Sequence, residues 1–545
     1  MSQAESLRAA LLEYLGTTFA LADASTRASL EDFLRSPETG LFRGPYVRLR
    51  LPFRPADDGW RSSLDWYGGY PQPYGHQAAA FRRLSSLGPD GGLRRPRPTL
   101  VTTGTGSGKT ESFLYPILDH VLRARRAGLG GIKAVILYPM NALANDQAKR
   151  LTELLTTHPE LGGVTAALYT GQQGPSRSKV SAAGLITDRE IIRDTPPDIL
   201  LTNYKMLDQL LLRHADAKLW TASARSLQYL VLDEFHTYDG AQGTDVAMLI
   251  RRLGLALKSH WPTEPEALTQ AGITDADVRR PLGMVTPVAT SATLGDKGDP
   301  SAMLNFARTV FGEEFSPESV VTESRLSISE WVSDARTAAE ARGLEARELG
   351  DVVARDLIDA VSAVDPTDPD AVTRAVISVL FEETGRSTSE KVAVPDLSRD
   401  SVDDLLNLVK AHPLISGERG LACLAERAVD LADLVDQALP PSSDPAWPSR
   451  AEQALTAVLS ALSHLRTKVG RGALSVDVHL WTRELTRLNR PTAGVGPGGW
   501  QDAGVVGQGG ADRGGRGYAP RGGGRLPSRP GGSDVVLFRR TADVK

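Results

Sequence analysis

A glycine-rich segment that ends in Gly-Lys-Thr, residues 103–110, restricts the possible folds of this chain more than any other feature. It follows the short apolar run 98–101 and precedes the apolar, helix-like stretch 112–118. A strand, such a loop and a helix predict a phosphate-binding loop, because glycines let backbone N–H groups surround phosphates at a helix N-terminus. Lys109 would reach the β- and γ-phosphates, and the Thr110 hydroxyl would hold Mg²⁺.

The composition indicates a large, soluble protein without a membrane partner. The chain has 545 residues and a formal net charge of −4, so it is long enough for several domains and carries no general excess of positive charge. Its one cysteine, Cys423, excludes a disulfide framework and a cysteine-rich zinc site within this sequence. Acidic residues from Glu5 onward are unlike a signal peptide, and no apolar run approaches the ~20 residues that span a bilayer. We therefore expect a cytoplasmic protein.

The residue pattern changes three times along the chain. Residues 1–70 form an N-terminal leader of one or two helices followed by the alternating, strand-like run 46–53. Residues 71–320 alternate short apolar runs with helical patterns, which predicts an α/β fold with a parallel sheet wrapped by helices. The expected strands are 99–102, 134–138, 166–169, 199–202, 230–233 and 287–291.

The remaining part of the chain has no pattern of a second parallel sheet. Residues 321–490 are rich in Ala, Leu, Asp and Glu at helical spacing, which predicts an all-helical domain or insertion. Its expected helices are 335–364, 402–411, 424–439 and 451–465. Residues 491–545 are rich in Gly and Arg without a helical or strand period, which predicts a disordered tail.

Two further segments complete a candidate hydrolysis site. The apolar run 229–232 is followed directly by Asp233 and Glu234. Asp233 would hold the hydrated Mg²⁺ and Glu234 would orient and deprotonate the attacking water, although such a pair can also merely cap a strand. Ser291-Ala292-Thr293 follows another apolar run and would hydrogen-bond toward the Asp-Glu pair, coupling hydrolysis to motion.

The phosphate loop, the acidic pair and the Ser-Ala-Thr segment, in this order along the chain, resemble the superfamily 2 DEAD/DEAH-box helicases. The resemblance covers about residues 40–325, with motif I at 103–111, motif II at 233–236 and motif III at 291–293. The resemblance implies a RecA-like lobe, a P-loop NTPase that uses ATP and Mg²⁺. The implied catalytic residues are Lys109, Asp233, Glu234 and His236. The implied cofactor-binding residues are Tyr74, Gln77, Thr103, Gly104, Thr105, Gly106, Ser107, Gly108, Lys109 and Thr110. The implied metal ligands are Thr110 and Asp233, and the implied coupling residues are Ser291, Ala292 and Thr293.

The resemblance also assigns segments for the base and for nucleic acid. Residues 73–77 are similar to the Q-motif region, in which Gln77 would read adenine and Tyr74 would stack on it. Motif Ia at 138–147, a glycine motif at 169–171 and motif Ib at 201–207 would line a nucleic-acid backbone, since small hydroxyls and N–H groups contact phosphates without reading bases. The implied contacts are Pro139, Asn141, Thr170, Gly171 and Thr202.

The sequence departs from the family pattern at Thr103, where a glycine usually stands, and at the bulky Phe235 of motif II. The block 233–245 resembles large bacterial DNA helicases that carry a C-terminal cysteine-cluster domain, which implies DNA rather than RNA as the partner. The resemblance therefore implies that ATP binding and hydrolysis drive DNA translocation or unwinding. A non-catalytic nucleic-acid-binding scaffold module and an RNA-directed helicase are the alternatives.

A helicase of this class needs a second RecA-like lobe, which supplies arginines to the γ-phosphate. The second-lobe pattern Gln-x-x-Gly-Arg-x-x-Arg has its nearest candidate at 508–516, inside the glycine-rich tail, and we interpret that match as chance. We expect this chain to be the N-terminal part of a longer helicase, with residues 491–545 disordered or read out of frame. The second lobe would then come from the missing C-terminal part or from another chain.

Overall fold

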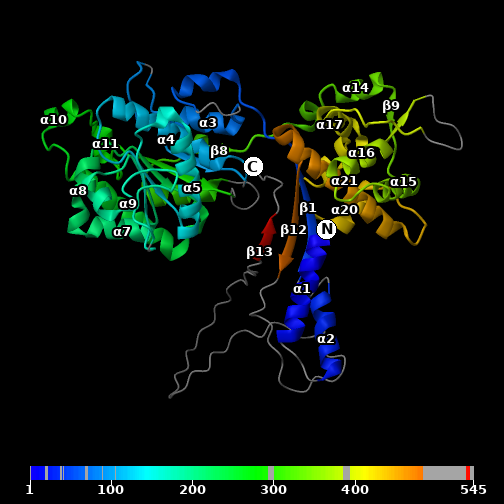
Figure 1. Ribbon diagram of the computed structural model, residues 1–545. Coiled ribbons are helices and arrows are strands. Elements are labelled where there is room, and N and C mark those ends of the chain that lie inside the picture. The colour runs from blue at the N-terminus through cyan, green and yellow to red at the C-terminus, as the bar shows by residue number, and fades with distance from the viewer. Residues whose placement is uncertain are drawn as a thin grey trace, which may run out of the picture. The chain divides into compact units, whose positions relative to one another are not determined.

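The computed structural model describes residues 2–18, 23–36, 40, 42–67, 72–88, 90–104, 106–172, 174–292, 300–384, 393–482 and 535–539. The chain forms two compact units (Figure 1). Unit 2 comprises Phe53–Leu326, and unit 1 comprises Met1–Pro52 together with Ser327–Lys545. Among the helices in these described ranges, none has both the length and the apolar character needed to cross a membrane.

Unit 2 is built on a seven-stranded sheet with the strand order β4-β5-β3-β6-β7-β2-β8, in which every pairing is parallel. The strands are β2 Thr99–Thr102, β3 Ala134–Leu137, β4 Ala166–Tyr169, β5 Ile199–Thr202, β6 Tyr229–Leu232, β7 Thr286–Ser291 and β8 Val320–Thr322. This sheet confirms the predicted α/β fold with a parallel sheet.

Helices cover both faces of this sheet (Figure 1). The helices of unit 2 are α3 Gly75–Leu84, α4 Lys109–Arg126, α5 Asn141–Thr157, α6 Arg189–Asp194, α7 Tyr204–Leu212, α8 Ala217–Ser223, α9 Gly240–Lys258, α10 Pro265–Gln270, α11 Asp275–Arg279 and α12 Ser301–Phe311. Alternate residues of β3 enter different hydrophobic clusters, with Ala134 and Ile136 in one and Val135 and Leu137 in the other. Helices α3, α4 and α5 supply the first cluster, whereas α7, α9 and α12 supply the second. The sheet is therefore buried on both faces, as expected for parallel strands.

Unit 1 combines helices with two small antiparallel sheets. Its strands are β1 Phe42–Arg50, β9 Leu344–Ala346, β10 Phe381–Glu383, β11 Val429–Asp430, β12 Ser475–Thr482 and β13 Val535–Arg539, ordered β11-β1-β12-β13 and β10-β9. Its helices are α1 Ser2–Thr18, α2 Ala24–Arg35, α13 Ile328–Val332, α14 Ala335–Ala341, α15 Asp351–Ser362, α16 Pro369–Val379, α17 Val402–Ala411, α18 Pro413–Ser416, α19 Leu421–Leu424, α20 Leu431–Ala438 and α21 Trp447–Val469.

The two units divide the chain differently from the expected boundaries at residues 70 and 320. Strand β1 pairs along its length with β12, and the buried guanidinium of Arg50 donates to Asp477 at 2.6 Å. Residues 1–52 therefore belong with the helical region, which contains strands as well as helices. Within the segment predicted to be a disordered tail, β13 pairs with β12. Residues 491–534 and 540–545 lie outside the described part of the chain.

Candidate functional site

The phosphate loop follows β2 and ends where α4 begins at Lys109. Gly106 and Gly108 have φ angles of 78° and 76°, a left-handed conformation that glycine adopts without strain. The buried hydroxyl of Ser107 donates to the Thr103 hydroxyl at 2.8 Å. Thr103 thus braces the loop from the position where a glycine is usual. Thr105 lies outside the described residues.

Helix α3 holds the second half of the loop. His76 Nε2 donates to the carbonyl of Ser107 at 2.8 Å, and Gln77 Nε2 donates to the carbonyl of Gly108 at 3.1 Å. Gln77 Oε1 accepts from the backbone N–H of Tyr74 at 2.9 Å. A Cβ atom on Gly108 would lie 2.2 Å from Gln77 Nε2, so this approach requires glycine. Gln77, the residue predicted to read adenine, thus ties the start of α3 to the phosphate loop.

Tyr74, predicted to stack on adenine, packs inside unit 2 with 9% of its surface exposed. Its ring centroid lies 4.8 Å from that of Phe53 and 5.6 Å from that of His76, which it stacks on at 20°. Burial lowers the pKa of His76 below its ordinary value of 6.5, which favours the neutral ring. In this structure Tyr74 contributes to the support of the phosphate loop through His76.

Lys109 and Glu234 meet directly, with Lys109 Nζ 2.9 Å from Glu234 Oε1. Glu234 follows β6 and has φ 50° and ψ 50°, a left-handed conformation that non-glycine residues rarely adopt. This backbone conformation turns the chain sharply at the end of the strand. Such strained backbone is common at functional sites.

Asp233 is buried at the end of β6, and this burial raises the pKa of its carboxyl group. The Thr290 hydroxyl donates to Asp233 Oδ1 and accepts from the backbone N–H of Glu234 at 3.3 Å. Thr290 therefore contacts both acidic residues from the neighbouring strand β7. Sequence reasoning missed Thr290, although it directly precedes Ser291 in the same apolar run.

Ser291 contacts both the segment after β6 and the phosphate loop. Its hydroxyl is 3.2 Å from His236 Nδ1, and its carbonyl accepts from the backbone N–H of Thr103 at 3.2 Å. His236 Nδ1 is also 3.5 Å from Glu234 Oε2. Ala292 follows the strand, whereas Thr293 lies outside the described residues.

The residues predicted to contact nucleic acid lie at the same edge of the sheet. Thr170 and Gly171 follow β4, Thr202 ends β5, and Pro139 and Asn141 follow β3. Because these three strands are adjacent and parallel, their carboxyl ends form one continuous edge. Strand β6, which carries the acidic pair, is the next in order.

Some of these residues make hydrogen bonds that join neighbouring strands or turns, whereas others are exposed or half-buried. The Thr202 hydroxyl is buried and donates to the carbonyl of Tyr169 at 2.6 Å, so it ties β5 to β4. Asn203 Nδ2 donates to Asn141 Oδ1 at 2.8 Å and joins the turns after β5 and β3. Gly171 is exposed, and Pro139 and Thr170 are half-buried. Asn203, which sequence reasoning did not single out, helps to shape this edge.

The residues that are present suit a magnesium nucleotide. The loop supplies backbone N–H groups at the start of α4, and Lys109 supplies an ammonium group that now bonds with a carboxylate. Asp233 supplies oxygen ligands of the kind that Mg²⁺ prefers, and Thr110 stands next to Lys109 in the first turn of α4. The donor set fits phosphate and Mg²⁺ together.

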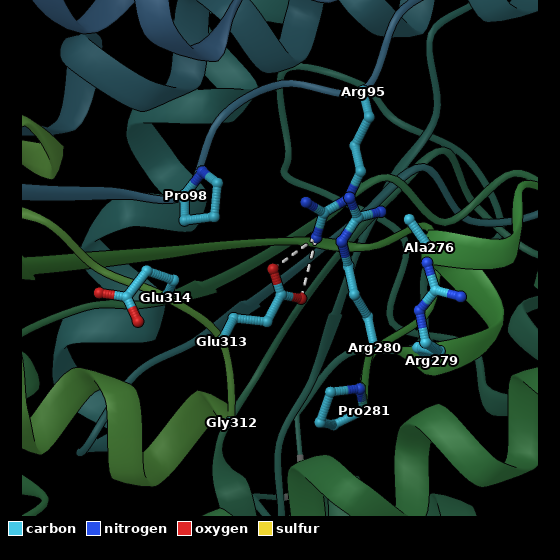
Figure 2. Close-up of a pocket in the computed structure, with 9 residues that line it drawn as sticks. All are labelled: Arg95, Pro98, Ala276, Arg279, Arg280, Pro281, Gly312, Glu313 and Glu314. Atoms are coloured by element: carbon cyan, nitrogen blue, oxygen red, sulfur yellow. Dashed lines mark hydrogen bonds and ion pairs between the residues drawn. The ribbon is translucent and has the colours of Figure 1, made fainter.

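A separate cavity of about 490 Å³ lies near the amino end of β2, and its lining includes Pro98 directly before β2 and Gly312 directly after α12 (Figure 2). Arg95 Nη2 lies 2.9 Å from both carboxylate oxygens of Glu313 and donates to the carbonyl of Val285 at 2.6 Å. The carboxylate of Glu313 thus neutralises the positive charge of Arg95 in the wall of this cavity. We assign this cavity no part in the site.

Comparison with known proteins places the site in a family. Residues 76–297 match the DEAD/DEAH box helicase family. The chain is 29% identical over 305 residues to the Druantia protein DruE of Escherichia coli (strain UMEA 4076-1), covering 38% of this chain and 16% of DruE. It is 28% identical over 240 residues to the uncharacterized ATP-dependent helicase YprA of Bacillus subtilis (strain 168), covering 44% of this chain and 27% of YprA.

A solved structure is also similar to this chain. It is that of the DUF1998 helicase MrfA bound to DNA, with 23% identity, a TM-score of 0.33, and coverage of 51% of this chain and 32% of that chain. The matched segments of DruE and YprA span less than a third of those relatives' own length. The family match covers the phosphate loop, the acidic pair and Ser291. Residues 76–297 of this chain therefore form a domain of the DEAD/DEAH box helicase family.

Proposed function

We propose that unit 2 is the ATP-binding and ATP-hydrolysing lobe of a helicase that translocates on or unwinds DNA. The observation that carries this proposal is the meeting of Lys109, Glu234, Asp233 and Ser291 at one edge of the sheet. The candidate nucleic-acid residues continue the same edge across β3, β5 and β4.

Lys109 and Thr110 would hold the nucleotide phosphates and Mg²⁺, and Asp233 would hold Mg²⁺ from the neighbouring strand. Bound Mg²⁺ would neutralise charge on the phosphate oxygens. Glu234 would accept the proton of the attacking water, which requires Glu234 to leave its ion pair with Lys109. Thr290 would orient the side chain of Asp233 and the backbone of Glu234 from β7.

Two contacts support Ser291 as the coupling residue. Ser291 bonds with His236 after β6 and with the first residue of the phosphate loop, Thr103. If nucleotide binding moves either of these segments, Ser291 would therefore move with it or lose a hydrogen bond. Gln77 and Tyr74 would recognise adenine after the α3 segment rearranges, since in this structure both side chains are engaged within unit 2.

We propose DNA as the nucleic acid because the block 233–245 is similar to that of large DNA helicases. Contacts through Pro139, Asn141, Thr170 and Gly171 would follow the backbone and leave bases unread. The Thr202 hydroxyl would act indirectly, by fixing the turn after β5.

Efficient turnover would need a second RecA-like lobe. The described residues contain one parallel sheet of this kind, that of unit 2. An arginine finger from a second lobe raises hydrolysis by about 10³–10⁵. This lobe would come from a further part of the polypeptide or from another chain, and without it we expect ATP to bind and to be hydrolysed slowly.

The proposal is tested by measuring ATP hydrolysis with and without single-stranded DNA, double-stranded DNA and RNA of equal length. Hydrolysis that DNA stimulates and that Glu234→Gln abolishes supports the proposal. RNA as the better stimulant would reassign the polymer. Binding of single strands that neither nucleotide nor Glu234→Gln alters would instead identify a non-catalytic scaffold.

A further inference from the structure

Glu323 contacts the phosphate loop although it lies 219 positions after Gly104 in the sequence. Its Oε2 accepts a hydrogen bond from the backbone N–H of Gly104 at 3.1 Å. The cause is the register of the sheet, because β8 pairs with β2 so that Thr322 lies beside Thr102. The residue after β8 therefore reaches the residues after β2, which form the loop.

The carboxylate of Glu323 is held in this position from its other side. Arg325 Nε donates to Glu323 Oε1 at 3.0 Å, and the Arg325 guanidinium lies 3.9 Å from the ring centroid of Phe53. Phe53 and Arg325 also form a backbone bridge. The side chain of Glu323 is 27% exposed, so it is a partly buried anion aimed at the loop.

The loop contacts a second carboxylate through Lys109, whose ammonium group bonds with Glu234. Loop N–H groups and the loop lysine are the groups that bind phosphate oxygens. A carboxylate oxygen is an anionic acceptor like a phosphate oxygen, so both carboxylates stand where phosphate charge is favoured. Glu234 belongs to the acidic pair, but Glu323 belongs to none of the helicase motifs discussed above.

We propose that Glu323 is an internal competitor of the nucleotide, whose carboxylate occupies the phosphate loop until a nucleoside triphosphate displaces it. This inference rests on the proposed function of the site. Displacement separates Glu323 from Gly104 and leaves its ion pair with Arg325 in place. The carboxylate therefore lowers the affinity for ligands with several phosphates and leaves a monophosphate little affected.

The test is a titration of the full chain with a fluorescent ATP analogue and Mg²⁺, with AMP measured by competition. Glu323→Gln removes the charge, and Glu323→Ala removes the acceptor as well. We expect both to bind the ATP analogue at least about fivefold more tightly, because a hydrogen bond to a charged group must no longer be broken. AMP should change by less than about twofold. The control Glu318→Gln removes an exposed carboxylate from the segment just before β8 and should leave both affinities unchanged.

Equal or weaker ATP-analogue binding in both Glu323 variants would overturn the inference and make Glu323 a support of the loop. If binding is lost in Lys109→Ala but insensitive to Glu323→Gln, the inference fails while the proposed nucleotide site stands. Absence of binding in the parent chain and in every variant would overturn the proposed site and the inference together.

Discussion

The ammonium group of Lys109 lies 2.9 Å from a carboxylate oxygen of Glu234, which joins the phosphate loop after β2 to the acidic pair after β6. One strand, β7, separates β2 from β6 in the sheet. The side chains are 11% and 25% exposed, so the pair lies partly shielded from solvent. Nucleotide binding would exchange this ion pair for a contact between Lys109 and phosphate. The predictions below follow from that exchange and from the residues around it.

Replacing Lys109 by alanine should abolish nucleotide-dependent activity. The loop would lose its only ammonium group, and we expect ATP hydrolysis to fall by at least about 100-fold, as when a positioned charge is removed from a reacting group. Steady-state phosphate release measures the effect. The matched control is Lys149→Ala in α5, whose side chain is 81% exposed, and it should retain parent activity. Similar losses in both variants would contradict the assignment of Lys109.

Replacing Glu234 by glutamine should separate binding from hydrolysis. The variant keeps the shape of the side chain but cannot accept a proton, so we expect hydrolysis to fall by about 10²–10⁴. Affinity for the ATP analogue should be retained or increase, because Lys109 loses a competing carboxylate. Single-turnover hydrolysis and equilibrium binding on the same sample distinguish the two effects. Parent-like hydrolysis would show that Glu234 is not the base.

Thr290 should control the response to Mg²⁺. Thr290→Val keeps the volume of the side chain but removes the hydroxyl that bonds Asp233 and Glu234, so we expect a higher Mg²⁺ concentration for half-maximal hydrolysis. A residue that hydrogen-bonds to a metal ligand in this way is worth about 10–100-fold in metal affinity. Thr290→Ser restores the hydroxyl and should restore the Mg²⁺ response. Failure of serine to restore it would assign Thr290 a packing role.

Unit 1 should lose stability in acid through His412. Burial lowers the pKa of His412 to about 4, and its ring donates from Nε2 to two carbonyls and accepts at Nδ1 from the Leu414 N–H. In the unfolded chain the pKa of His412 is ~6.5, so the unfolded chain binds the proton first as the pH falls. The contribution is therefore complete above about pH 6.5 and is lost as the pH falls toward 4, by roughly 3 kcal/mol.

Chemical denaturation at neutral pH and at pH values below about 5 measures this loss. His412→Gln cannot titrate and should show a shallower pH dependence than the parent chain. The control is the exposed His214→Gln, which should keep the parent pH dependence. Identical slopes for the parent and His412→Gln would contradict the assignment.

Much of unit 2 was predictable because its strands are short apolar runs with clear limits. The run at 99–102 became β2 with the same limits, and the run at 287–291 became part of β7. Strand β8 was not predicted, since it has only two apolar residues, Val320 and Val321, and depends on pairing with β2. A local pattern cannot report a pairing that distant residues supply.

The architecture of unit 1 depended on such distant pairings. The helical pattern at 402–411 predicted α17 with the same limits. The expected helix 335–364 is instead α14 and α15 separated by β9, which pairs with β10. The pairing of β1 with β12 joins the N-terminal residues to the end of the helical region, and no periodicity in either strand indicates its partner.

For the candidate site, the order of the motifs predicted that Lys109 and Glu234 belong to one site. In the structure their side chains are in contact. The sequence could not indicate Glu323, because its contact with Gly104 follows from the register of β8 against β2. It also gave no sign that Gln77 would bond with Gly108. Motifs predict which segments meet, whereas the side chains that fill the space between them emerge only from packing.

The most direct test of the central claim is equilibrium binding of a fluorescent ATP analogue to the full chain, with Mg²⁺ present and then removed by a chelator. We expect saturable binding that weakens when Mg²⁺ is removed, that is lost in Lys109→Ala and that persists in Lys149→Ala. Binding that is equal in the parent chain and in Lys109→Ala, or no saturable binding in the parent chain, would contradict a nucleotide site at the phosphate loop.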